Sequence, residues 1–201
     1  MKRMIVAVAA AGVMMSAAGS AGAYVVSLGG AAVPNEGLTT TVAGATTINF
    51  NDGLPPANYL GGGVVSGNSP GFFLQPGGDG SFYFTVGTNT AVGVATLPGL
   101  SNYFGLHWGS MDNYNSLTLS RGGVNLFTLT GDQFLPDRDA YVNVFASNSG
   151  EYFDKITFSS STNAFESDNH AFRLVPEPSS YAMMVAGLML AGVIMRRRVK
   201  A

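Results

Sequence analysis

Side chains alternate between two faces in the stretch Ser81-Phe82-Tyr83-Phe84-Thr85-Val86, the clearest β pattern in the chain. Phe82, Phe84 and Val86 fall on one face and the two residues between them fall on the other, because successive side chains of a strand point to opposite sides. Residues 115–120 and 141–146 repeat this alternation. A period of two over several residues predicts β-strands rather than helices.

About nine such runs, rich in β-branched and aromatic residues, recur between residues 46 and 174. Clusters of Gly, Asn, Asp and Pro separate them, and these residues supply the backbone conformations that turns need. The expected strands are 46–50, 81–86, 91–96, 102–108, 115–120, 124–129, 141–146, 155–159 and 164–174. We therefore predict an all-β fold, a β-sandwich that is jelly-roll-like, with its first and last strands near each other.

The N-terminus has the pattern of a cleaved secretory signal peptide. Lys2 and Arg3 precede an uncharged apolar stretch, residues 4–15, and small residues follow it. The apolar stretch is too short to cross roughly 30 Å of hydrocarbon. We expect residues 1–23 to be removed on export, leaving residues 24–174 as one exported β domain.

The C-terminus, residues 175–201, carries three features in a fixed order. Two prolines flank a glutamate at 176–178, which favours a stiff, extended stem. Residues 179–195 are uncharged and would extend about 25 Å as a helix, enough to cross a thin bilayer. The basic tail, residues 196–201, would then stay in the cytoplasm. The sequence thus predicts a C-terminal transmembrane helix.

This order of features resembles the PEP-CTERM sorting signal of Gram-negative bacteria, which an exosortase recognises. The resemblance implies that the inner membrane holds the protein as a transient anchor until the exosortase processes it. Delivery to the cell surface or extracellular matrix would follow. The residues that the resemblance assigns to sorting recognition are Pro176, Glu177, Pro178, Arg196, Arg197 and Arg198.

The exported domain carries a second resemblance. Residues 103–115 and 164–169 are similar to a group of exosortase-dependent surface proteins, as are the shorter segments 48–50 and 61–67. This resemblance implies a fold and a destination. The group has no established enzymatic activity, so the resemblance implies none for this chain.

Composition excludes several classes of function. The chain has no cysteine, so it contains neither disulfides nor a thiol nucleophile. Residues 24–175 hold eleven acidic and four basic side chains, a net charge of −7. A surface of that charge repels phosphate backbones, and no basic stripe interleaved with aromatic residues is present. We expect no nucleic-acid partner.

The two histidines are the natural candidates for a general base. His107 and His170 both lie in predicted strands, where a packed or hydrogen-bonded role is the simpler interpretation. Residues 109–112 contain Gly-Ser but lack the second glycine of a nucleophile elbow. We therefore expect a protein that is not an enzyme.

Oxygen-bearing side chains suggest a calcium site. Glu166 and Asp168 lie near the last strand, and Asn51 or Asp52, after the first, would come close to them in a jelly roll. Calcium accepts six to eight oxygen ligands in loose geometry. The simpler alternative is that Glu166 and Asp168, two residues apart, share a solvent-facing side of the strand and bind no cofactor. Both interpretations remain open from the sequence.

Three aromatic residues, Tyr103, Trp108 and Tyr114, could stack on sugar rings, although aromatic residues in strands usually belong to the core. The expected function is a structural or adhesive surface or matrix protein. The alternative is a carbohydrate-binding module for exopolysaccharide.

Overall fold

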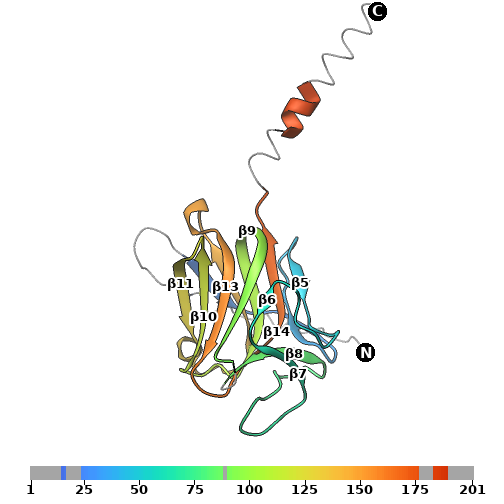
Figure 1. The fold of residues 1–201 in the computed structure, drawn as a ribbon, viewed down its shortest axis with the longest axis vertical. Helices are drawn as coiled ribbons and strands as arrows, with labels where there is room; N and C mark the ends of the chain where they lie inside the picture. Colours follow the sequence, from blue (N-terminus) through green and yellow to red (C-terminus); the bar gives the residue numbers. More distant parts are fainter. Residues whose placement is uncertain (1–14, 17–23, 88–89, 177–182, 190–201) are drawn as a thin grey trace, which may run out of the picture.

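The computed structural model describes residues 15–16, 24–87, 90–176 and 183–189 (Figure 1). The rest of the predicted signal peptide, Glu177 and Pro178 of the motif, and the arginines at 196–198 lie outside the described residues. The described chain consists mainly of strands paired in antiparallel fashion, with little helix. The prediction of an all-β class is confirmed.

The strands, in chain order, are β1 Met15–Ser16, β2 Tyr24–Leu28, β3 Ala31–Val33, β4 Gly37–Thr39, β5 Thr46–Ile48, β6 Tyr59–Leu60, β7 Gly63–Ser66, β8 Phe82–Val86, β9 Val92–Gly109, β10 Asn115–Arg121, β11 Val124–Thr130, β12 Ala140–Ala146, β13 Phe153–Ser160 and β14 Phe165–Leu174. Two short 3₁₀ helices, η1 Gly131–Phe134 and η2 Ser149–Glu151, lie between strands. The β3–β4 hairpin forms a small sheet of its own, and the other strands belong to one large sheet.

The long strand β9 organises the large sheet because its two halves have different partners. Residues 92–96 pair with β13, and two of them also pair with β6. Residues 103–108 pair with β12 on one side and mostly with β14 on the other. The sheet therefore curls around a core, with β13, β10 and β11 reached through one half of β9 and β14 and β8 through the other (Figure 1).

Aromatic side chains from both halves of the curled sheet fill the core. Phe158 of β13 and Phe165 of β14 meet edge to face, with ring centroids 5.6 Å apart. Trp108 of β9 stacks on Phe165 at 4.5 Å, and all three side chains are fully buried. Rings of this size bury a large apolar area, so this cluster is a main source of stability.

The nine expected strands all occur, although 91–96 and 102–108 are joined in β9. The expected neighbourhood of the first and last of them is confirmed, since β5 pairs with β14 through Ile48 and His170. The sequence interpretation missed six short strands, β1, β2, β3, β4, β6 and β7. Several of these have few residues and adjoin glycines, which weakens any periodic signal.

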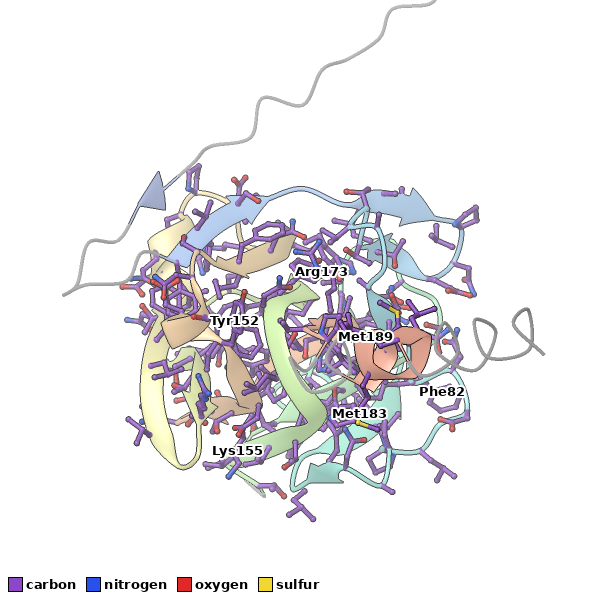
Figure 2. The ribbon with its side chains drawn as sticks, turned by 90° about the horizontal axis from the view of Figure 1, so that it is seen from above. Phe82, Tyr152, Lys155, Arg173, Met183 and Met189 are labelled. Atoms are coloured by element: carbon purple, nitrogen blue, oxygen red, sulfur yellow. The ribbon has the colours of Figure 1, made fainter. Side chains whose placement is uncertain are left out.

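Residues 183–189 form a short helix in which every residue is exposed; Met183 and Met189, labelled in Figure 2, are 73% and 67% exposed. Among the described residues, no helix is both long enough and apolar enough to cross a bilayer. The remainder of the predicted span, 179–182 and 190–195, lies outside the described residues.

Candidate functional site

A buried polar layer covers the outer face of β14. The β3–β4 hairpin and the irregular segment 67–81 lie over this face. The Asn169 side chain donates to the main-chain oxygens of Glu36, at 2.6 Å, and Leu38, at 3.1 Å. The Leu74 N–H donates to Glu166 Oε1 at 2.8 Å. Glu166 and Asn169 are therefore enclosed, although the sequence alone would place such polar side chains in solvent.

A local irregularity in β14 separates the outer face from the core. Asn169 has a φ of 50°, and the register with β9 shifts between Asp168 and Ala171. Asp168 and Asn169 consequently meet the covering segments, while His170 joins the aromatic core. β14 thus places the Asp168 carboxyl group on its outer, covered face and the His170 imidazole in the core.

Asp168 is the least compensated group of this layer. Its side chain is 0% exposed, and neither carboxylate oxygen has a hydrogen-bond partner. Burial, together with the nearby charges of Asp79 and Glu36 and the close approach of the Asp79 carboxyl group, raises the pKa of Asp168 to about 9. The Asn169 N–H lowers this pKa somewhat without reaching hydrogen-bond geometry. The carboxyl group therefore favours a proton or another positive neighbour at neutral pH.

Asp79 faces Asp168 from the segment 67–81. Asp79 Oδ1 accepts hydrogen bonds from the Ser81 N–H, at 2.8 Å, and from Ser81 Oγ, at 2.6 Å. Asp79 Oδ2 is buried without a partner. Sequence reasoning missed Asp79, because its setting between Gly78 and Gly80 indicates only a turn.

Glu166 forms the second buried acid of β14. It is 1% exposed, and its Oε2 has no partner. Burial raises the pKa of Glu166 to about 7, against the opposing effect of the Leu74 N–H. Asn51 and Asp52, by contrast, occupy an exposed turn in which Asp52 Oδ1 accepts from the Leu54 N–H at 3.0 Å.

The expected calcium ligands are therefore not equivalent: two are exposed, and two are buried under other segments. Within the ranges that the structure describes, no group of three or more His, Asp or Glu side chains is placed to hold a metal ion by itself. A metal at this layer would need main-chain oxygens or water as additional ligands.

Both histidines have their ring nitrogens engaged. His107 Nδ1 accepts from the Leu38 N–H at 3.1 Å, so its Nε2 donates to Asp139 Oδ1 at 2.8 Å. Burial alone would raise the pKa of Asp139, but the hydrogen bonds from His107 and the Gly77 N–H lower it below its usual value. His107 therefore fixes the covering segments to the sheet and has no free nitrogen for catalysis.

His170 lies in the aromatic core. Its Nδ1 is 2.9 Å from the Tyr59 hydroxyl, and its Nε2 is 2.9 Å from Ser167 Oγ. Burial lowers the pKa of His170 to about 3, so the ring is neutral at physiological pH. The imidazole acts as a polar, hydrogen-bonded member of the core.

The aromatic residues considered for sugar stacking are largely enclosed. Tyr103 and Trp108 are 0% exposed, and the Tyr103 hydroxyl donates to Asn143 Oδ1 at 2.8 Å. Tyr114 is half-buried and donates to Asp112 Oδ2 at 2.6 Å. Neither Tyr103 nor Trp108 can present a face to a sugar unless the fold opens.

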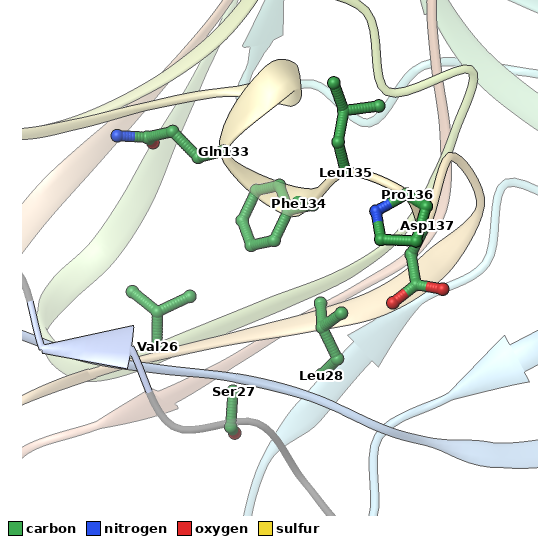
Figure 3. A pocket seen from close by; sticks show the side chains of 8 residues that line it. All are labelled: Val26, Ser27, Leu28, Gln133, Phe134, Leu135, Pro136 and Asp137. Atoms are coloured by element: carbon green, nitrogen blue, oxygen red, sulfur yellow. The ribbon is translucent and has the colours of Figure 1, made fainter.

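A cavity of about 120 Å³ lies between β2 and η1 (Figure 3). Its surface is mostly apolar, and its lining residues are Val26, Ser27, Leu28, Gln133, Phe134, Leu135, Pro136 and Asp137. Neither histidine and none of the buried acids of the polar layer contributes to it. The cavity is therefore separate from the polar layer and is mainly an apolar hollow.

No family model matches the chain, and a search of curated proteins finds no match. The sequence signals at the two ends and the geometry of the β domain are what point to a function.

Proposed function

We propose that this protein is an exported, exosortase-processed component of the cell surface or extracellular matrix of a Gram-negative bacterium, with a structural or adhesive role. The observation that carries the proposal is the terminal order of Pro-Glu-Pro, an uncharged apolar run at 179–195 and the arginines at 196–198. That run would anchor the chain in the inner membrane until an exosortase processes it.

The position of the motif relative to the fold supports this proposal. β14 ends at Leu174, and the Val175 N–H donates to the Leu100 oxygen at 2.8 Å. Pro176, the next residue, is exposed. The motif thus begins where the sheet's hydrogen bonding ends, so an enzyme could reach it without unfolding the domain.

Removal of residues 1–23 would take away β1, which pairs with β2 through Met15 with Val26 and Ser16 with Val25, but the β domain has an attachment of its own at Tyr24. Tyr24 begins β2 and is 4% exposed. Its hydroxyl donates to the main-chain oxygen of Glu151 at 2.6 Å. Its ring stacks on Phe127 with centroids 4.5 Å apart. A mature chain starting at Tyr24 would therefore be held at its first residue.

A non-enzymatic role fits the described residues, because His107 and His170 both have their nitrogens engaged. We also propose that the curled sheet is a jelly-roll-like sandwich, which the pairing of β5 with β14 supports. In this proposal the domain supplies a stable body for display rather than a reaction centre.

Altering the sorting signal should prevent delivery. Glu177→Ala, or deletion of residues 196–198, is expected to leave most of the protein in the inner membrane, whereas the unaltered chain reaches the surface or medium. Fractionation of the producing cells followed by immunoblotting measures this. Asp132→Ala, at an exposed position of the β domain, is the matched control and should be delivered normally. Unchanged delivery of both sorting variants would contradict the proposal.

A further inference from the structure

Apart from Glu166 Oε2, three carboxylate oxygens of the polar layer are buried without a hydrogen-bond donor. They are both oxygens of Asp168 and the Oδ2 of Asp79. The two side chains are 0% and 7% exposed, so water does not replace the missing partners to any large extent. A buried carboxylate without compensation is costly, and such groups in folded proteins take up a proton or bind a cation.

Main-chain hydrogen bonds hold the covering segments over Asp168. The Gly37 N–H donates to the Gly78 oxygen at 3.2 Å, and the Gly80 N–H donates to the Asn35 oxygen at 3.1 Å. These bonds join the β3–β4 hairpin to the segment 67–81 on either side of Asp79. These bonds therefore fix the backbone on both sides of Asp79.

The charged groups around Asp168 do not neutralise it. Asp79 faces it from the segment 67–81, and Glu36 adds negative charge from the hairpin. His107 lies opposite Asp168 in β9, but its nitrogens are used by the Leu38 N–H and Asp139. No lysine or arginine among the described residues forms an ion pair with either Asp79 or Asp168.

We propose that Asp79 and Asp168 bind a calcium ion that joins β14 to the segments covering it. The donors are oxygens only, which favours a hard cation over zinc. Calcium accommodates irregular shells, so two carboxylates can be completed by main-chain oxygens and water, with Glu36 contributing negative charge nearby. Of the ligands predicted from the sequence the site keeps Asp168, omits Asn51, Asp52 and Glu166, and adds Asp79.

A shared proton is the competing explanation, and it accounts for less of the geometry. One proton between Asp168 and Asp79 would give partners to two of the three oxygens. The second oxygen of Asp168 would remain buried without a donor. A cation bound by both side chains can satisfy all three.

Thermal unfolding with and without calcium tests the site. The full chain in a mild detergent is unfolded at about pH 8, in about 10 mM CaCl₂ or in EGTA, with circular dichroism as the readout. If calcium is present at about 100 times its Kd, the midpoint should rise by roughly 5–10 °C. The same concentration of MgCl₂ should produce a smaller rise, because magnesium demands a regular octahedral shell.

Variants test whether the calcium-dependent rise of the unfolding midpoint depends on Asp79 and Asp168. Asp168→Asn and Asp79→Asn keep the side-chain size and should fold but lose the calcium-dependent rise. Asp52→Asn, which alters the exposed turn, should retain it. Superimposable wild-type curves in calcium and EGTA, together with a more stable Asp168→Asn protein in both, would overturn the proposal in favour of a shared proton. A calcium-dependent rise that survives in both Asn variants would also overturn it, by placing the ion elsewhere.

Isothermal titration calorimetry keeps the proposal testable if either variant fails to fold. Calcium added to the wild-type chain should give a saturable binding signal that EGTA removes. No binding to the folded wild-type chain would overturn the proposal.

Discussion

Replacement of Phe158 by alanine is expected to lower the free energy of unfolding by about 3–5 kcal/mol. Phe158 is fully buried in β13, and its removal would leave a cavity between strands reached through the two halves of β9. Its ring contacts residues from four other segments: Tyr59, Phe84, Phe104, Phe165 and His170. These partners cannot all move into the space that the ring leaves. The decrease in the free energy of unfolding should therefore be large for the replacement of a large side chain by a small one.

Urea denaturation of the full chain in a mild detergent measures this loss. Phe72→Ala is the matched control, because Phe72 is 57% exposed and its truncation should change the free energy by no more than about 0.5 kcal/mol. A loss below about 1 kcal/mol for Phe158→Ala would show that the aromatic cluster is not the core of the fold.

In the absence of calcium, the folded protein is expected to lose stability as the pH rises from about 4 to about 9. The pKa of Asp168 is about 9 in the folded chain, against its ordinary 3.8. At low pH the carboxyl is protonated in both states, so its burial carries no charge penalty. Between the two pKa values the folded state keeps a proton that the unfolded state releases, which progressively favours unfolding. Glu166, with a pKa of about 7, adds to the same trend over a narrower range.

The size of this effect should be several kcal/mol, since each unit of pKa difference corresponds to about 1.4 kcal/mol. Stability of the wild type and of Asp168→Asn, measured in EGTA across this pH range, provides the test. The variant should have a much flatter profile and should exceed the wild type at alkaline pH. Asp132→Asn is the control and should keep the wild-type profile. Equal slopes for the wild type and Asp168→Asn would contradict the assignment of the trend to Asp168.

The strands could be predicted where side chains alternate between a buried and a partly solvated face, as at 115–120. Where the sequence predicts two strands, 91–96 and 102–108, the structure has the single strand β9, which continues through Pro98 and Gly99. In the structure, pairing with β13 breaks after Thr96 and resumes at Ser101, so the missing N–H of Pro98 disrupts no ladder bond to β13. Whether a strand can contain Pro98 depends on how the neighbouring strand pairs with it. The local sequence does not show this pairing.

The polar layer could be predicted only in part. Glu166 and Asp168 stand out as acids in a strand, but the segments that bury them are rich in glycine and have no period. Tyr83 is buried for the same reason, since its hydroxyl donates to the Gly67 oxygen at the start of the covering segment. Trp108 is buried for a different reason, because it packs in the core against Phe134 and Phe165, and sequence alone could not distinguish it from an exposed sugar platform.

Mass spectrometry of the terminal peptides of the delivered protein tests the proposed function most directly. Protein recovered from the cell surface or medium should begin at Tyr24 and should lack the basic tail at 196–201. Delivered protein that retains both residues 1–23 and the arginines at 196–198 would contradict export with exosortase processing.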